Sequence, residues 1–326
     1  MDRNAFPIAK SVLAPDALAQ HIAIRYQLEQ VRCQLLTATM RDVYHVTAAH
    51  QRFMFFVYPS RHRTREEILA EWQFVAFLAA HGIPVAPAYP ATSGELVLSF
   101  DAPEGLRYGV LSMYLPGEIL RRQSSPQTVA SYGAQIARIH VIADTLPVTL
   151  VRPVNNPRQI VHDALRAAES AIADRADVLT ALYHACDVLL PHIEQLVPAA
   201  PSYGLIHGDV IRANAIVGPA ETVSVIDFDL CGLGWRAYDI ASYLFAICGT
   251  RDEVRLRAAF LDGYTRMRPL SLMEQELLPL FEAVRAVFDI GIPASAVNSW
   301  GRASVDAFLD GSLAQLNHCI DRLLPS

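Results

Sequence analysis

The first third of the chain consists of short runs of β-branched and aromatic residues that are separated by polar breaks. Residues 32–38, 42–47 and 53–58 form three such runs, and residues 95–100 and 108–114 form two more. Runs of this length and composition predict β-strands. We therefore expect about five strands within this part of the chain.

One helical pattern lies between the third and the fourth of these strands. Thr64 can cap the helix, and Glu67, three residues later, completes a capping box. Apolar residues then recur at helical spacing, and Gly82 ends the pattern. The apolar positions are Ile68, Trp72, Val75 and Leu78. A further helix is expected before the first strand, over residues 14–26.

The remaining two thirds of the chain are dominated by helical periodicity. A break around Pro116 and Gly117 separates this part from the strand-rich part, and Pro126 starts the first long helix. The other expected helices cover residues 158–173, 178–196, 237–248, 251–267, 272–290 and 304–323. Strands followed by helices predict an α+β fold.

One hairpin interrupts the helical part and carries the most informative polar residues. Its two apolar runs, residues 213–217 and 223–226, predict two strands joined by a short turn. The polar residues at its open end are His207, Asp209, Asn214, Asp227 and Asp229. Because a hairpin places its two open ends side by side, carboxylates and an amide are expected to face one another. Phosphoryl transfer needs such a set, in which one acid orients an alcohol and other oxygens hold a divalent metal.

The spacing of these residues resembles that of a known family. His207-x-Asp209, Asn214 five residues later, and a strand that ends in Asp227-Phe228-Asp229 resemble the motifs of the aminoglycoside phosphotransferase and choline kinase family. The resemblance implies a protein-kinase-like fold with two lobes. Residues 1–115 would form a small antiparallel-sheet lobe with one helix that binds the nucleotide. Residues 116–326 would form a large, mainly helical lobe with the catalytic loop, the metal site and the substrate site.

The resemblance also assigns roles to the residues at the mouth of the hairpin. Asp209 would be the catalytic base that orients the substrate hydroxyl. Asn214 and Asp227 would bind Mg²⁺ through oxygen atoms, which are the ligands that this hard ion prefers. ATP or GTP would be the phosphoryl donor, and a small molecule with a hydroxyl group would be the acceptor.

Three further residues near the motif have supporting roles in this interpretation. His207 is expected to brace the catalytic loop rather than to titrate during the reaction. Asp239, near a predicted helix start, is expected to bond backbone groups near His207. Asp229 either assists the site or faces the solvent.

In the small lobe, the resemblance implies a set of nucleotide-binding residues. Glu71, on the predicted helix, would pair with a strand Lys that holds the phosphates. The adenine would lie against the backbone of Ser112, Met113 and Tyr114.

The small lobe departs from the family pattern in two ways. Residues 35–44 contain no glycine, although a Gly-rich turn lets backbone N–H groups approach phosphates. Phe56 occupies the strand position at which Lys or Arg is expected, and Lys10 is the only Lys in the chain. We expect Glu71 either to pair with one of the arginines that follow this strand or to turn out to solvent. Those arginines are Arg61, Arg63 and Arg65.

Composition narrows the class of protein and its compartment. The net charge of −6 and the absence of a basic stripe argue against nucleic-acid binding. Five scattered cysteines without metal-site spacing indicate buried thiols in a reducing compartment. No apolar run approaches eighteen residues, so neither a membrane span nor a signal peptide is expected. These observations favour a cytoplasmic protein and leave its oligomeric state open.

Three functions agree with the sequence. The first is a Mg²⁺-dependent kinase that phosphorylates a small-molecule hydroxyl. The second is a pseudokinase that binds a nucleotide or ligand without turnover, which Phe56 favours. The third is a protein Ser/Thr kinase of the stress-response type. The intact set of Asp209, Asn214 and Asp227 favours the first.

Overall fold

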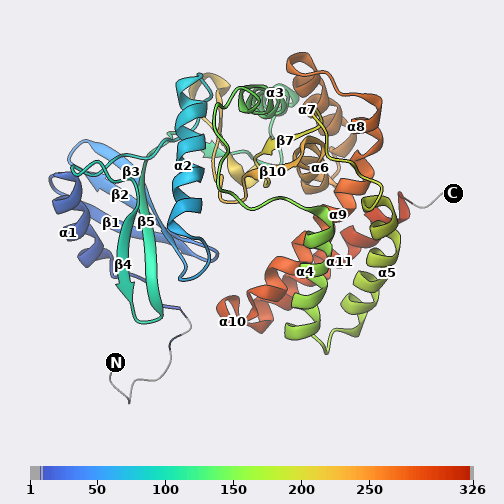
Figure 1. Cartoon of the computed structure of the whole chain (residues 1–326), viewed down its shortest axis with the longest axis horizontal. Coiled ribbons are helices and arrows are strands. Elements are labelled where there is room, and N and C mark those ends of the chain that lie inside the picture. Colours follow the sequence, from blue (N-terminus) through green and yellow to red (C-terminus); the bar gives the residue numbers. More distant parts are fainter. Residues whose placement is uncertain (1–7, 9, 324–326) are drawn as a thin grey trace. The chain divides into compact units, whose positions relative to one another are not determined.

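The computed structural model describes residues 8 and 10–323 and divides into two compact units, Met1–Pro116 and Gly117–Ser326 (Figure 1). The first unit contains a five-stranded antiparallel sheet with the strand order β1-β2-β3-β5-β4. Its strands are β1 (Arg32–Ala38), β2 (Asp42–Ala48), β3 (Gln51–Tyr58), β4 (Leu98–Ala102) and β5 (Gly105–Met113). The predicted number of strands is confirmed.

In the described part of the first unit, the two helices pack on opposite faces of this sheet (Figure 1). Alternate residues of a strand point to opposite faces, so the odd-numbered and even-numbered residues of β3 separate. Phe53 and Phe55 pack with Ile22 of α1 (Pro15–Tyr26) in the core. On the other face, the ring of Phe56 lies 5.7 Å from that of Trp72, in α2 (Arg65–Ala80).

The start of α2 agrees with the predicted capping box. The backbone N–H of Glu67 donates to Thr64 Oγ1 (3.2 Å), and the backbone N–H of Thr64 donates to Glu67 Oε2 (2.9 Å). The predicted apolar stripe of Ile68, Trp72, Val75 and Leu78 is buried. Glu71 is buried on the same helix, so α2 also places a carboxylate under the sheet.

The fourth and fifth strands are shifted from their predicted bounds because they form a tight hairpin. Ala102 pairs with Gly105 across a two-residue turn, so β4 runs beyond Phe100 and β5 begins before Tyr108. Gly105 has a φ of +127°, a conformation that favours glycine. A break that appears polar in the sequence is therefore part of the sheet.

The second unit is mainly helical. Its helices are α3 (Pro126–Ala143), α4 (Pro157–Ala171), α5 (Ala176–Ile193), α6 (Arg236–Ile247), α7 (Glu253–Met267), α8 (Leu272–Glu276), α9 (Leu278–Ser295), α10 (Val297–Trp300) and α11 (Arg302–Asp321). The single helix predicted over residues 272–290 is wrong, because the chain forms α8 and then α9. Pro279 stands in the first turn of α9, where its missing N–H costs no helical bond.

Glycines bring two of these helices into close contact. A Cβ atom at Gly263 of α7 would lie 1.9 Å from the carbonyl oxygen of Ala130 in α3. A Cβ atom at Gly133 of α3 would lie 2.2 Å from the carbonyl oxygen of Phe260 in α7. The backbones of α3 and α7 can therefore cross at this distance only because both positions lack a side chain.

Two small sheets hold the predicted hairpin and the loop before it. β8 (Ala215–Val217) and β9 (Val223–Val225) pair with β6 (Glu118–Ile119) in the order β6-β8-β9. β8 begins later than predicted because residues 212–214 form a 3₁₀ turn. The sequence analysis missed β7 (Tyr203–Ile206) and its partner β10 (Gly232–Trp235), which is glycine-rich. Among the described residues, no helix is long and apolar enough to cross a membrane.

Candidate active site

The loop between β7 and β8 is fixed by a buried carboxylate. Asp239, in the first turn of α6, accepts the backbone N–H of His207 at 2.8 Å and that of Gly208 at 2.7 Å. Asp239 is completely buried, so these bonds replace the water that its charge would otherwise hold. The predicted role of Asp239 as a brace for the backbone near His207 is confirmed.

A chain of hydrogen bonds extends from Asp239 to α7. In α3, Nε2 of His140 lies 2.9 Å from Oδ2 of Asp239, and Nδ1 of His140 lies 2.7 Å from the hydroxyl oxygen of Tyr264. Burial lowers the pKa of His140, and this effect outweighs the opposing influence of Asp239. Burial alone would raise the pKa of Asp239, but the hydrogen bond from His140 and the other donors hold it below its usual value. A neutral His140 that donates to an ionised Asp239 satisfies both shifts.

The side chain of His207 connects the two ends of the hairpin. Its Nδ1 accepts the backbone N–H of Asp209 (3.2 Å), so its Nε2 carries the proton and donates to the carbonyl of Ile226 (2.9 Å). Both ring nitrogens are thus used for structure, as predicted. Gly208 between them has a φ of +84°, and a Cβ atom there would lie 2.2 Å from the carbonyl oxygen of Leu230. Only glycine fits this position.

Asp209 is held by two side chains from different elements. Asn214 donates through Nδ2 to Asp209 Oδ2 (2.7 Å), and Arg285 of α9 donates through Nη1 to Asp209 Oδ1 (2.6 Å). Arg285 also donates through Nε to Asp289 Oδ1 (2.8 Å). Burial opposes its charge, but Asp289 and then Asp209 raise the pKa of Arg285 overall. The guanidinium therefore stays ionised between two carboxylates.

Sequence reasoning missed Arg285 and Asp289. The available signal was a charged pair four residues apart on the apolar side of a predicted helix. Such a pair has a structural explanation in most proteins, and the sequence does not connect it to Asp209, 76 residues away.

Asp227 lies at the other open end of the hairpin. The backbone N–H of Ile226 donates to the carbonyl of Asn214 (3.0 Å), so Asp227 directly follows the residue that pairs with Asn214. Asp227 has a φ of +65°, which is uncommon outside glycine and is often found at functional sites. The structure thus brings Asp209, Asn214 and Asp227 to one end of the hairpin.

The backbone after Asp227 is clamped by side chains from the segment before α4. Arg152 donates through Nε to the carbonyl of Cys231 (2.9 Å) and also bonds the carbonyl of Asp229. Asn155 donates to the carbonyl of Leu230 (3.1 Å). Asp229 is buried, so the alternative that it faces the solvent is wrong.

The oxygen atoms at this end of the hairpin suit a hard cation that phosphate oxygens also coordinate. Because Asn214 Nδ2 is bonded to Asp209, its Oδ1 is the atom that can act as a ligand. Asp227 adds carboxylate oxygens. Among the described residues, no group of three His, Cys, Asp or Glu side chains is arranged to hold a metal. Two protein ligands fit Mg²⁺, which is usually bound by one or two side chains together with substrate phosphates.

The predicted nucleotide-binding residues of the first unit lie at the end of β5. The hydroxyl of Ser112 donates to the carbonyl of Ala86 (3.0 Å), and the backbone N–H of Met113 donates to the carbonyl of Pro87 (3.1 Å). These two donors are therefore engaged within the unit. Tyr114 follows β5, and its ring packs under the guanidinium of Arg52, 4.2 Å from the ring centroid. The contact of this segment with adenine stays a prediction.

Glu71 has partners that the sequence analysis did not consider. It accepts from Arg41 Nη1 at 3.3 Å and from the hydroxyl of Tyr58 at 2.9 Å. The alternative that Glu71 turns out to solvent is wrong, because its side chain is buried. Phe56 stands at the strand position where the family resemblance expects a Lys. Glu71 still has a cationic partner, because Arg41, which directly precedes β2, reaches it.

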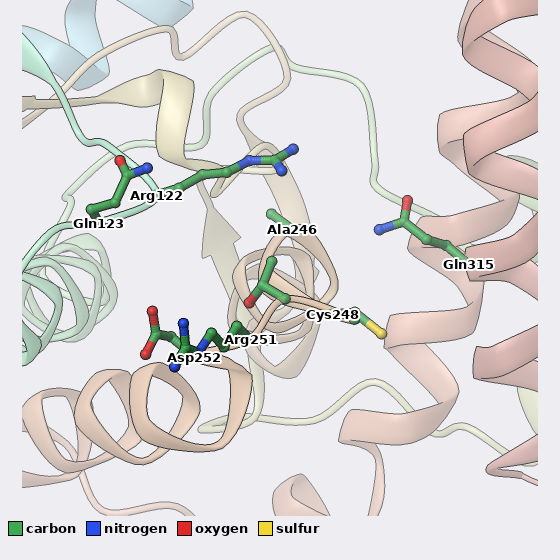
Figure 2. Close-up of a pocket in the computed structure, with 9 residues that line it drawn as sticks. Arg122, Gln123, Ala246, Cys248, Arg251, Asp252 and Gln315 are labelled. Carbon is green, nitrogen blue, oxygen red and sulfur yellow. The ribbon is translucent and has the colours of Figure 1, made fainter.

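A pocket of about 460 Å³ opens elsewhere in the second unit (Figure 2). Arg122 and Gln315 extend toward one another from its opposite sides, and Arg251 and Asp252 lie below them in this view. Neither Asp209, Asn214 nor Asp227 lines it. The pocket is therefore not assigned to the reaction.

Comparison with protein families decides the class of this arrangement. The model of the phosphotransferase enzyme family (APH) matches residues 35–271, a range that includes the loop of Asp209 and the whole hairpin. The chain belongs to the phosphotransferase enzyme family. The predicted family and the predicted kinase-type phosphotransferase are thereby confirmed.

Two relatives each match more than two thirds of the chain. An uncharacterised protein of Deinococcus radiodurans is 33% identical over 304 residues, which cover 91% of this chain and 87% of the relative. A homoserine kinase of Rhodopseudomonas palustris is 30% identical over 236 residues, which cover 68% of this chain and 69% of that enzyme.

Solved structures establish the fold. A microcompartment-associated aminopropanol kinase superposes with a TM-score of 0.80 at 23% identity and covers 94% of this chain and 98% of its own. An amicoumacin kinase superposes with a TM-score of 0.78 at 20% identity, with 96% of both chains covered. The predicted kinase-like α+β fold is confirmed.

Proposed function

We propose that this phosphotransferase transfers the γ-phosphoryl group of ATP or GTP to a hydroxyl of a small molecule, with Asp209 as the catalytic base. The observation that carries the proposal is the fixation of the Asp209 carboxylate. Asn214 and Arg285 each donate to a different oxygen of this group, on a loop that Asp239 braces. Such positioning contributes most of the catalysis in phosphoryl transfer, in which the protein has little covalent chemistry to perform.

In the proposed reaction, Asp209 accepts a hydrogen bond from the acceptor hydroxyl and directs its oxygen toward the γ-phosphorus. A bond forms between the acceptor oxygen and phosphorus while the bond to the β–γ bridging oxygen breaks. Asp209 takes the hydroxyl proton, and the nucleoside diphosphate leaves. Each carboxylate oxygen of Asp209 has two lone pairs, so the bonds from Asn214 and Arg285 leave capacity for the substrate.

Asn214 and Asp227 are the residues that would hold Mg²⁺. When bound there, the ion would neutralise charge on the nucleotide phosphates. Asn214 has a second function that does not depend on the ion. Its Nδ2 fixes Asp209, so one side chain couples the position of the base to the position of the ligand oxygen.

Amino alcohols are the acceptor class that we would test first. The similar proteins include a homoserine kinase and an aminopropanol kinase, and the compounds in both names carry an amino group and a hydroxyl group. In this chain, Asp289 lies beside Arg285 and Asp209 in the second unit. An acid near the base suits an acceptor that carries an ammonium group.

The direct experiment is a nucleotide-turnover screen. Purified protein is incubated with Mg²⁺, with ATP or GTP, and with a panel of small alcohols that includes amino alcohols, sugars and aminoglycosides. We expect acceptor-dependent release of nucleoside diphosphate with at least one compound, and the same reaction should fail with the Asp209→Asn variant. Diphosphate release that does not depend on Asp209 would contradict the proposal.

One observation favours a second function, that of a pseudokinase which binds a nucleotide without turnover. Phe56 stands on β3 where the family resemblance expects a cation. Nucleotide binding without turnover of any acceptor in the screen would favour this alternative.

A further inference from the structure

The aromatic residue on β3 has a cation on top of it. The guanidinium carbon of Arg41 lies 4.8 Å from the ring centroid of Phe56 and 5.2 Å from that of Tyr58. Phe56 and Tyr58 share the face of the sheet that packs against α2. Arg41 is only 6% exposed, which is unusual for an arginine in a turn between two strands.

Hydrogen bonds fix the position of this guanidinium. Arg41 Nη1 donates to Glu71 Oε1 at 3.3 Å and to the hydroxyl of Tyr58 at 3.1 Å. The hydroxyl of Tyr58 donates to Glu71 Oε2 (2.9 Å) and accepts from Trp72 Nε1 (3.1 Å). The α2 glutamate thus has a cationic partner, although that partner comes from the β1–β2 turn.

The turn that carries Arg41 is itself anchored. Ala38 pairs with Asp42, so residues 39–41 form a three-residue turn. The ammonium of Lys10 donates to the carbonyls of Ala38 (2.7 Å) and Thr39 (2.9 Å). Arg107 donates to Asp42 Oδ2 at 2.7 Å, and both of these side chains are completely buried. The only lysine of the chain therefore holds the turn and not the phosphate position of β3.

We propose that Arg41 takes the place of the missing strand lysine and binds the α- and β-phosphates of the nucleotide. This inference rests on the proposed function. A guanidinium has five N–H donors in one plane, so it can bond Glu71 and phosphate oxygens together. Phe56 serves as an apolar platform that supports the guanidinium, where a lysine side chain would otherwise lie.

The same geometry accounts for the turn without glycine. A Gly-rich turn contributes backbone N–H groups to phosphates. Here the turn contributes a side-chain cation instead, and arginine is well suited to bidentate contact with phosphate. Two departures from the family pattern, the missing glycine and Phe56, are then parts of one arrangement.

The test compares ligands with and without phosphates. Affinities for ADP, ATP and adenosine are measured by titration calorimetry for the parent and for Arg41→Gln. We expect Arg41→Gln to weaken ADP and ATP binding about ten- to a hundredfold, because charge-assisted hydrogen bonds are lost. Adenosine binding should stay within about twofold, since adenosine has no phosphate.

Three further variants separate phosphate binding from stability. Arg25→Gln removes an arginine at the surface that pairs with Glu95. This variant should leave the affinities for ADP, ATP and adenosine unchanged. Arg63→Gln tests the rival arginine that follows β3. The double variant Arg41→Gln/Phe56→Lys should regain most of the lost ADP affinity, because it returns a cation to the strand position near Glu71. Thermal unfolding of each variant reports whether it is folded.

The outcomes distinguish this inference from the proposed function. Equal weakening of adenosine and ADP by Arg41→Gln would overturn the inference, since it would indicate a purely structural role. The inference would also be overturned if Arg41→Gln bound ADP and ATP as tightly as the parent. In that case Arg63→Gln would be expected to weaken their binding. Turnover by the parent together with either result would leave the proposed function standing. A parent that binds no nucleotide would refute both.

Discussion

Arg285 offers the sharpest test of how the second unit supports Asp209. The Arg285→Met substitution keeps most of the apolar side-chain volume but removes the charge between Asp209 and Asp289. Both bonds of the guanidinium, at 2.6 Å and 2.8 Å, are then lost. Removal of one partner from a buried ion pair costs about 3–5 kcal/mol.

The partial exposure of the two acids sets the magnitude. The side chains of Asp209 and Asp289 are 19% and 23% exposed, so some water can reach them once the arginine is gone. We therefore expect the lower end of the range, about 3 kcal/mol. For a domain of 150–250 residues this corresponds to a fall in melting temperature of roughly 6–12 °C.

The stability that Arg285→Met loses should also depend on pH. Burial raises the pKa of Asp289, and Arg285 opposes that rise. Without Arg285, the pKa in the folded state should rise further above the unfolded value. A carboxyl group with a raised pKa in the folded state does not change the free energy of unfolding at a pH below its pKa in the unfolded state. It lowers that free energy progressively as the pH rises through its pKa in the folded state. The deficit of Arg285→Met should thus be larger at pH 8 than at pH 5.

Urea unfolding of matched variants measures both effects. The Arg285→Met/Asp289→Asn double variant should regain part of the lost stability, because it removes one uncompensated carboxylate. Arg166→Met, which breaks an exposed pair with Asp163, should cost less than about 1 kcal/mol. A loss below 1 kcal/mol for Arg285→Met, or a loss that is the same at both pH values, would refute this account of the ion pair.

Four shorter predictions address other parts of the chain. Asp209→Asn should retain the parent melting temperature within a few degrees and lose turnover by roughly 10³-fold or more, as measured by diphosphate release. Asp227→Ala should bind nucleotide equally with and without Mg²⁺, whereas the parent should bind it more tightly with Mg²⁺; equal binding by the parent would contradict the metal site. As the pH falls below about 6.5, the parent should lose more unfolding free energy than His140→Gln, by up to about 1.4 kcal/mol per pH unit. The reason is that the pKa of His140 is lowered in the folded protein, so the unfolded chain takes up a proton at His140 that the folded protein does not. Parallel urea-unfolding profiles of the two proteins would argue against this. Thr64→Ala should cost about 1 kcal/mol of unfolding free energy through loss of the cap, and a change below 0.3 kcal/mol would show that α2 does not need it.

The sequence predicted those parts of the fold whose pattern is local. β1 was predicted with its observed bounds, because a seven-residue run without Gly or Pro is bounded by short polar breaks. The capping box of α2 is a four-residue motif, and it was predicted for the same reason. The hairpin near Asp209 was found from the contrast between two short apolar runs and the polar residues around them. Its first strand was predicted two residues too early, since a 3₁₀ turn is not visible in hydrophobicity.

What the sequence did not reveal depends on contacts between distant residues. Arg41 and Arg285 are two arginines among many, and only tertiary structure connects them with Glu71 and Asp209. β10 contains two glycines in four residues, so its composition argued against a strand. Gly232 is needed there, because a Cβ atom would lie 2.0 Å from the carbonyl oxygen of Pro153.

The close crossing of α3 and α7 has a consequence for how substitutions in this protein should be interpreted. Gly263 precedes Tyr264, whose hydroxyl bonds His140, and Gly133 is two turns before His140 on the facing helix. Any residue larger than glycine at either position must push the two helices apart.

Such a displacement would lengthen the bond between Tyr264 and His140, and it would loosen the link through Asp239 to the loop that carries Asp209. The spacing of α3 and α7 therefore affects the position of Asp209, which we propose as the catalytic base. Variants at Gly133 or Gly263 would resemble catalytic defects in a turnover assay, although neither glycine has a side chain with which to take part in the reaction.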